Sequence, residues 1–179
     1  LERAVAVAMA EAQRWEGVVA RRRAAAAALV FPYPAPRPHQ GELIDIIAEG
    51  LETGRPVVAA APTGIGKTVT ALLPGMRHAL SQGAQTLYLT AKTTQRKLVG
   101  ETFAELHRAA GAQLTAITLA RRDQLCPPGH LRCHPDACPL LDDFERRARE
   151  TGAVAQLLET SPHLTPRQLY RFGESRTLC

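Results

Sequence analysis

The alternation of apolar and polar positions along the chain predicts several helices. Residues 1–29 are rich in Ala, Arg and Glu and contain no proline, which favours a helix. Apolar spacings of three and four predict further helices at 39–54 and 94–110, closed by Gly54 and Gly111. A helix from Lys67 to about Leu80 is also expected, and Pro74-Gly75 is expected to kink it or end it early.

In the helices expected at 39–54 and 94–110, the apolar positions predict which side chains are buried. They recur on one face of each helix, at Leu43, Ile46, Ile47 and Leu51 in the first case and at Leu98, Phe103 and Leu106 in the second. Towards the end of the chain, the residue pattern favours helices at 141–150 and 153–158. Thr165-Pro166 is expected to begin a last short helix.

Short apolar runs between these helices predict buried strands. Residues 57–61, 86–90 and 114–119 each fit a strand that is buried on both faces. From residue 39 the order is therefore helix, strand, helix, strand, helix, strand. Such alternation predicts an α/β fold in which helices cover a parallel sheet.

Changes in composition divide the chain into three parts. Residues 31–38 contain four prolines and read as an extended linker, and after residue 120 the sequence turns to Cys, Pro, His and Arg with little periodicity, as in an insertion. We expect a helical arm or the tail of an upstream region at 1–30, a first globular part at 31–120 and an inserted domain at 121–179. Because the chain begins with Leu1 and stops at Cys179, we expect it to be a piece of a longer protein.

Composition narrows the class of protein. No run of about 18 apolar residues suggests a membrane span, and the order of charges near the start differs from that of a secretory signal. The net charge of +5 and the pI near 9.4 favour an anionic partner such as nucleic acid. The short arginine runs that carry much of this charge are also compatible with ordinary solvated faces.

One segment has the pattern of a phosphate-binding loop. Ala61-Pro-Thr63-Gly64-Ile65-Gly66-Lys67-Thr68 follows a predicted strand and precedes a predicted helix. The glycines allow backbone N–H groups to point at phosphate oxygens, Lys67 would reach the β- and γ-phosphates, and Thr68 would offer its hydroxyl to Mg²⁺. The strict pattern has glycine where this chain has Ala61, and a chance glycine loop is the alternative.

Two polar segments flank this loop in the sequence. Upstream, Arg37 and Gln40 precede the second helix, and a glutamine amide can pair with adenine through one donor and one acceptor, although Gln40 could equally serve the helix start. Downstream, small hydroxyls, one Lys and one Gln follow the second strand and suit contacts with phosphate oxygens; an ordinary helix cap is the alternative. The candidate DNA-binding residues there are Thr90, Lys92, Thr93 and Gln95.

The four cysteines favour a metal site. Cys126, Cys133 and Cys138 are separated by six and four residues, and Cys179 follows much later. Four thiolates suffice for tetrahedral zinc or for an iron–sulphur cluster, and spacing alone does not decide between them. His130 and His134 leave a mixed Cys/His zinc site open, and free thiols remain a further alternative.

Taken together, these motifs resemble those of superfamily 2 helicases of the XPD/DinG type, the DEAD_2 family. Ala-Pro-Thr-Gly-x-Gly-Lys-Thr resembles motif I, Phe-Pro-Tyr with Arg37-Pro-His-Gln40 resembles the Q-motif, and the segment from Leu87 to Gln95 resembles motif Ia. The sequence segments around the cysteines also resemble the family. Leu119-Ala-Arg-Arg-Asp-Gln-Leu-Cys126, for example, resembles the start of its iron–sulphur domain. The resemblance covers residues 31–179.

The resemblance implies a function. It implies a partial P-loop (RecA-like) motor domain with a small inserted α-rich domain, in which the four cysteines hold a 4Fe–4S cluster. It also implies ATP and Mg²⁺ as cofactors, single-stranded or forked DNA as partner, 5′-to-3′ unwinding, a role in DNA repair, and a monomer in the bacterial cytoplasm associated with the nucleoid.

Hydrolysis by such a motor requires an acidic pair at the end of an apolar strand. Asp142-Asp143 is the one candidate, and its surroundings read as a helix face instead. We therefore expect turnover from a longer parent protein rather than from this chain. A zinc-containing nucleic-acid-binding P-loop protein without unwinding activity is the main alternative; a small-molecule kinase would leave Arg37, Gln40 and the cysteines unexplained.

Overall fold

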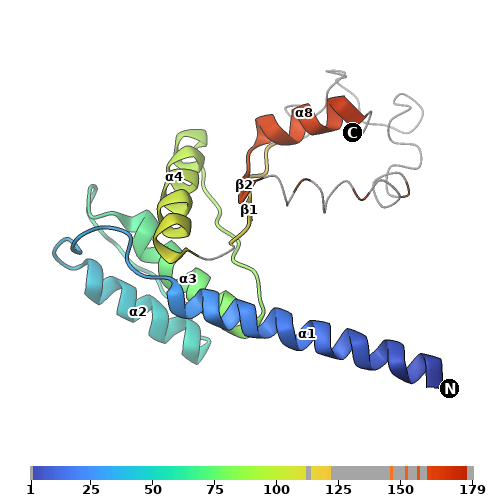
Figure 1. The fold of residues 1–179 in the computed structure, drawn as a ribbon. Coiled ribbons are helices and arrows are strands. Elements are labelled where there is room, and N and C mark those ends of the chain that lie inside the picture. Colours follow the sequence, from blue (N-terminus) through green and yellow to red (C-terminus); the bar gives the residue numbers. More distant parts are fainter. Residues whose placement is uncertain are drawn as a thin grey trace. The chain divides into compact units, whose positions relative to one another are not determined.

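The computed structural model describes residues 2–111, 114–121, 146, 152, 157 and 161–176. The chain divides into two compact units, residues 1–113 and 114–179. Figure 1 labels the helices and strands of each unit.

The first unit consists of four helices, all at positions that the sequence predicts. They are α1 (Glu2–Ala28), α2 (Gln40–Thr53), α3 (Lys67–Gln82) and α4 (Thr93–Ala110). Helices α2, α3 and α4 each end at a glycine with left-handed backbone, as at Gly54, where φ is 67°. A left-handed residue directly after a helix favours glycine because it carries no Cβ.

Helix α3 is the centre of this unit. It packs against α1, α2 and α4, and it supplies most of the buried apolar side chains, among them Val69, Leu72, Leu73, Met76 and Ala79. Helix α3 does not end early at Pro74, one of the two expected effects of that proline; it runs on through Pro74, which is itself buried. A proline inside a helix removes one backbone hydrogen bond, and the burial of its neighbours in the core offsets that loss.

The predicted apolar stripes are buried only in part. Phe103 and Leu106 of α4 are buried as expected, whereas Leu98 is 50% exposed. In α2 the expected stripe is covered only in part, since Leu43, Ile47 and Leu51 are half-buried and Ile46 is 46% exposed; the fully buried positions of that helix are Gln40 and Gly50. Helical spacing thus identified the helices without fixing which face is covered.

The N-terminal helix is joined to the rest of its unit at one end. Ala25 and Leu29 are buried where α1 packs against α3. Arg22 also donates a hydrogen bond from Nη1 to the carbonyl oxygen of Gly83 at 2.9 Å. Helix α1 therefore packs on α3 at its C-terminal end (Figure 1).

The expected sheet is the main correction. Within the described residues, segments 57–61 and 86–90 form no strand, and Val58 is 99% exposed. The third expected strand, 114–119, shortens to β1 (Ala116–Ile117). Apolar runs become strands only where another segment takes up their backbone hydrogen bonds, and local pattern does not supply that partner.

The second unit contains a small parallel sheet and a helix. Strand β1 pairs with β2 (His163–Leu164), with Ala116 opposite His163 and Ile117 opposite Leu164. Leu114 and Leu164 are buried in this unit, and the Thr118 hydroxyl lies 2.7 Å from Nε2 of His163. Burial of His163 lowers the pKa of its imidazole below the ordinary value.

Helix α8 (Pro166–Arg176) begins where the sequence predicts. Its start is closed by a reciprocal cap. The Thr165 backbone N–H donates to Oε1 of Gln168 at 2.9 Å, and the Gln168 N–H faces the Thr165 hydroxyl oxygen at 3.4 Å. This exchange is a capping box, with Pro166 in the first helical position, where a missing N–H costs nothing. The helices expected at 141–150 and 153–158 lie largely outside the described residues.

None of the helices that the structure describes is long and apolar enough to cross a membrane.

Candidate nucleotide-binding site

The predicted phosphate loop turns sharply just before α3. Gly64 and Gly66 have φ of 87° and 84°, in the left-handed region where glycine is favoured. Gly66 is the N-cap of α3, which begins at Lys67. The first N–H groups of a helix have no partner within the helix and attract anions, so the loop ends at a backbone suited to phosphate.

Lys67 lies back against the start of the loop. Its Nζ donates to the carbonyl oxygens of Ala61 at 2.8 Å and Pro62 at 2.7 Å. Its side chain is exposed, whereas Thr68 beside it is half-buried. A bound polyphosphate would offer the ammonium charged oxygens in place of neutral carbonyls, and charged acceptors make the stronger hydrogen bonds.

The segment before α2 forms a tight turn. The Gln40 N–H donates to the carbonyl oxygen of Arg37 at 3.0 Å, and His39 has a positive φ of 65°. These are the hydrogen bond and the left-handed third residue of a type II turn, with Pro38 at the position where proline is favoured. The turn brings the side chains of Arg37 and Gln40 to the same place, the phosphate loop.

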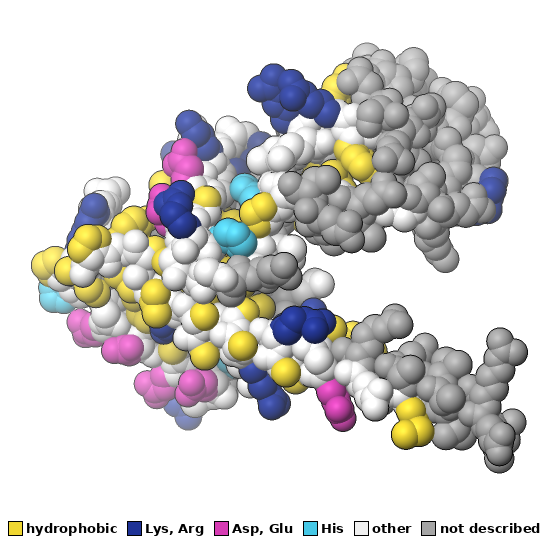
Figure 2. All heavy atoms as spheres, viewed as in Figure 1, with side chains coloured by type: hydrophobic (Ala, Val, Ile, Leu, Met, Phe, Trp, Pro, Cys, Tyr) yellow, Lys and Arg dark blue, Asp and Glu magenta, His cyan; other side chains and the backbone are white. Residues whose placement is uncertain are grey.

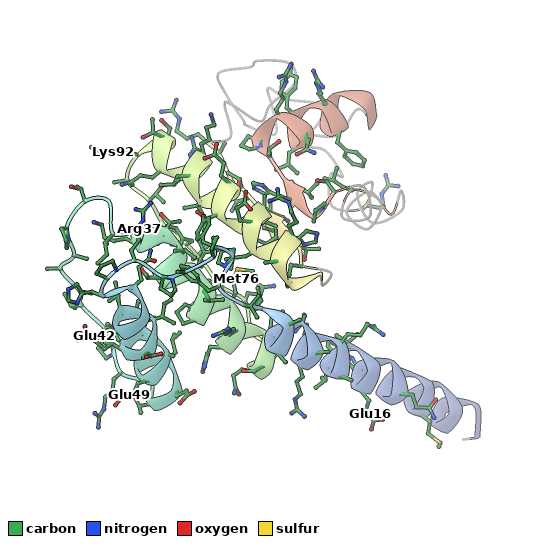
Figure 3. The ribbon with its side chains drawn as sticks, turned by 60° about the vertical axis from the view of Figure 1, so that its left-hand side comes forward. Glu16, Arg37, Glu42, Glu49, Met76 and Lys92 are labelled. Atoms are coloured by element: carbon green, nitrogen blue, oxygen red, sulfur yellow. The ribbon has the colours of Figure 1, made fainter. Side chains whose placement is uncertain are left out.

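Both side chains hydrogen-bond to that loop. Nε2 of Gln40 donates to the carbonyl oxygen of Ile65 at 2.6 Å, while its Oε1 accepts the Arg37 backbone N–H at 2.6 Å. The Arg37 guanidinium donates from Nη1 to the carbonyl oxygen of Gly64. Figure 3 labels Arg37, which lies in the connection that precedes α2. The structure thus brings together Arg37, Gln40 and Thr63–Thr68, which the sequence placed in one nucleotide site.

The residues present fit a nucleoside triphosphate with Mg²⁺. The loop combines two left-handed glycines, a helix N-terminus, an ammonium group and the hydroxyl of Thr68. A Cβ at Gly64 would meet no atom within 4 Å, so the loop is open on that side. This donor set suits phosphate oxygens and a hard cation that prefers oxygen ligands.

The predicted DNA-binding residues gather at the start of α4. Lys92 is its N-cap, with extended backbone and no side chain that caps the helix, and Thr93 and Gln95 are exposed in the first turn. The Thr90 hydroxyl donates to the carbonyl oxygen of Lys92 at 3.1 Å. Lys92 lies at this helix end in Figure 3. An uncapped helix start beside a lysine suits a phosphate oxygen.

Charge differs between the helices of the first unit. The exposed outer face of α2 is acidic, and Figure 2 shows this gathering of acidic side chains; its members are Glu42, Asp45, Glu49 and Glu52. A polyanion is repelled by such a face and attracted by the start of α4.

The predicted metal ligands lie elsewhere in the chain. Cys126, Cys133, Cys138 and Cys179 fall outside the described residues. Within the part of the chain that the structure describes, no group of His, Cys, Asp and Glu side chains could hold a metal ion.

Some contributors to the site escaped sequence reasoning. The carbonyl oxygens of Ala61, Pro62, Gly64 and Ile65 anchor Lys67, Arg37 and Gln40. Every residue has such a carbonyl, so no residue type signals this role. The sequence singled out Arg37 and Gln40 as polar residues before the helix, and it did not indicate which carbonyl oxygens they bind.

Comparison with known proteins identifies the segment that holds this loop. Residues 37–125, just under half of the chain, match the family model described as DEAD/DEAH box helicase. The match supports the assignment of this segment to a helicase superfamily. It implies a P-loop (RecA-like) fold, use of ATP and Mg²⁺, and binding of nucleic acid. No curated protein and no solved structure shows significant similarity to the chain.

Proposed function

We propose that the chain is the nucleotide-binding portion of an ATP-dependent DNA helicase of the XPD/DinG type. The observation that carries this proposal is the geometry of the phosphate loop: two left-handed glycines lead into α3, with Lys67 and Thr68 in its first turn. This loop lies within the segment that matches DEAD/DEAH box helicases. In such a motor, binding and hydrolysis of ATP drive movement along nucleic acid.

Each proposed role follows from the chemistry of the side chain. Lys67 would stabilise negative charge on the β- and γ-phosphates, and Thr68 would ligate Mg²⁺. The backbone N–H groups of residues 63–68 would surround the phosphates. Arg37 and Gln40 complete the site through their hydrogen bonds to the carbonyl oxygens of Gly64 and Ile65.

Single-stranded DNA is the proposed nucleic acid. Lys92 and Thr93 at the start of α4, with Thr90 and Gln95, would contact the phosphate backbone, and the overall positive charge supports such a partner. Unwinding in the 5′-to-3′ direction, preference for forked DNA, a monomeric state and work in DNA repair at the bacterial nucleoid come from the resemblance alone.

We further propose that Cys126, Cys133, Cys138 and Cys179 bind a 4Fe–4S cluster. The support is the resemblance of the segments around these cysteines to the family's iron–sulphur domain. The first of them, Cys126, directly follows the matched segment, which ends at residue 125. Anaerobically purified protein should be brown and contain about four iron and four inorganic sulphide per chain. Colourless protein with one zinc would instead support a zinc-containing nucleic-acid-binding P-loop protein.

The nucleotide part is tested by binding. We expect the chain to bind ATP with Mg²⁺, and Lys67→Met to weaken that binding at least about tenfold, as expected for loss of charge-assisted hydrogen bonds. Lys97→Met is the matched control, because Lys97 lies on α4 in an exposed pair with Glu101 at 3.7 Å. Equal ATP affinity in Lys67→Met and the unchanged chain would contradict the proposal.

The motor part is tested by activity. ATP hydrolysis should rise on addition of single-stranded DNA, and a duplex with a 5′ tail should unwind faster than one with a 3′ tail. Hydrolysis that is indifferent to DNA would favour the kinase alternative.

A further inference from the structure

Helix α1 extends beyond the end of α3. The carbonyl oxygen of Leu29 accepts the hydrogen bond from Arg77 in the middle of α3. Nearer the start of the chain, Arg22 donates to the carbonyl oxygen of Gly83, at the C-terminal end of α3. The residues of α1 before Arg22 therefore continue past α3, as Figure 1 shows. This stretch precedes the segment that matches the helicase family, which begins at residue 37.

An indole side chain is exposed on this stretch. Trp15, the one tryptophan of the chain, is 65% exposed. Val19, one turn further along the same face, is 38% exposed. Tryptophan is highly buried on average in folded proteins, so so large an exposed fraction leaves an apolar ring surface open to a partner. An open aromatic ring is the platform on which an unpaired nucleobase stacks.

Arginine side chains follow the indole along the helix. Arg21, Arg22 and Arg23 are consecutive, and at a rise of 1.5 Å per residue the last of them lies about 12 Å from Trp15 along the helix axis. Glu16, labelled in Figure 3, is the one acidic residue between residues 15 and 30. The stretch at 15–23 therefore carries a net positive charge.

Two of these guanidinium groups are available to an anion. Arg21 and Arg23 are exposed, and within the described residues neither forms an ion pair with a carboxylate. Nη1 of Arg21 lies 3.5 Å from the position that a Cβ of Gly17 would take. The Arg21 side chain thus lies back along the helix by one turn, towards Trp15, in space that the glycine leaves open.

From these observations we infer that residues 15–23 of α1 bind single-stranded DNA, with the indole of Trp15 stacked on a base and the arginines in contact with phosphates. Positive charge and an open aromatic ring are together complementary to a polyanion whose bases are unstacked. Bases within a duplex are already stacked on their neighbours and offer the indole no free face. The inference rests on the proposed function, because it adds a second contact surface for the same nucleic acid.

The indole itself provides the measurement. Because Trp15 is the one tryptophan of the chain, all indole emission reports on this stretch. Binding of oligo(dT) to the whole chain is followed by the anisotropy of a labelled oligonucleotide and, separately, by the emission of Trp15. We expect the emission to be quenched on binding, with the same dissociation constant from both signals, and duplex DNA to quench it less.

Two variants separate stacking from charge. Trp15→Ala should weaken binding at least about fivefold, the effect of losing one stacked base, and Met9→Ala is its control, because Met9 is a 60% exposed apolar residue of the same helix. Replacing both Arg21 and Arg23 by Ala should lower the slope of log affinity against log salt by about 1.4, for two phosphate contacts on a single strand. Arg55→Ala, at an exposed arginine beyond the end of α2, is the control for charge.

The outcomes are distinguishable. If anisotropy reports binding while the emission of Trp15 stays unchanged, the strand binds elsewhere, and the inference falls while the proposed function stands. If no oligonucleotide binds, the proposed nucleic-acid partner falls together with the inference. Emission that changes with protein concentration in the absence of DNA, with a doubled mass in light scattering, would assign the stretch to a second copy of the chain and overturn the inference.

Discussion

Arg77, in the middle of α3, donates a hydrogen bond from Nε to the carbonyl oxygen of Leu29 at 2.8 Å. The two residues are 48 positions apart, and the bond joins the end of the N-terminal helix to the helix that begins at the phosphate loop. Leu29 is itself fully buried at this contact. The N-terminal helix is therefore a structural support of the loop-bearing helix at this end.

Removal of the Leu29 side chain should destabilise the first unit. Leu29→Ala deletes a fully buried side chain, and such truncations cost about 2–5 kcal/mol of the free energy of unfolding. Val30→Ala is the control, because the neighbouring Val30 is 49% exposed and should change that free energy by less than about 0.5 kcal/mol. Urea unfolding followed by circular dichroism measures both, and equal stabilities would show that α1 does not support α3.

Gly66 and Gln40 should be energetically coupled. In Gly66→Ala the new Cβ meets Nε2 of Gln40 and also requires a strained left-handed backbone. In a Gln40→Ala background the clash disappears and only the backbone strain remains. Thermal unfolding of the four proteins should give a coupling of about 0.5–3 kcal/mol, with Gly66→Ala the milder change in that background. Additive costs would show that the two residues do not touch.

The stability of the second unit should fall in acid. Burial lowers the pKa of His163 below its ordinary value of 6.5, so the unfolded chain binds a proton more readily than the folded one. The contribution of His163 is therefore present above pH 6.5 and is lost as the pH falls through the lowered folded-state pKa. Thermal unfolding between about pH 5 and pH 8 should show this slope, and it should vanish in His163→Gln. A slope that persists in the variant would assign it to other groups.

The exposed apolar segments 57–61 and 86–90 should promote association. Val58 is 99% exposed and Leu89 is 81% exposed, on segments that pair with no strand in the described part of the chain. Unpaired apolar strands invite pairing with other chains. Val58→Lys should lower light scattering in concentrated solution without reducing the melting temperature. Val69→Lys, at a buried valine of α3, should instead unfold the protein, and scattering unchanged by Val58→Lys would contradict the prediction.

Lys92 should contribute to the binding of single-stranded DNA through its charge. Lys92→Ala should weaken binding and reduce the slope of log affinity against log salt by about 0.7, the value for one phosphate contact on a single strand. Arg108→Ala is the control, because Arg108 lies at the other end of α4 and is paired with Glu105. A salt slope that is the same for both variants would remove Lys92 from the proposed DNA contact.

Helices and their ends followed closely from local sequence. The bounds of α2, α3 and α4 fall within a few residues of those expected, and Gly54, Gly83 and Gly111 mark their ends. The same holds for the cap of α8 at Thr165. These features depend on hydrogen bonds between residues at most about five positions apart, which neighbouring side chains control.

The sheet was the part that local sequence could not supply. Segment 114–119 has the composition of a strand, and the structure pairs its centre with His163–Leu164 rather than with 57–61 or 86–90. Strand pairing joins residues far apart in the chain. An apolar run therefore indicates that a pairing strand is needed and does not identify which segment supplies it.

The sequence by itself determined the chemistry of the candidate nucleotide site: glycines at 64 and 66, a lysine and a threonine at a helix start, and an arginine and a glutamine upstream. The tertiary structure decided what those last two side chains touch. Arg37 and Gln40 lie more than twenty positions from the carbonyls they bind, and a carbonyl is the same in every residue type. Only the fold, by bringing the turn before α2 against the loop before α3, selects which carbonyls these are.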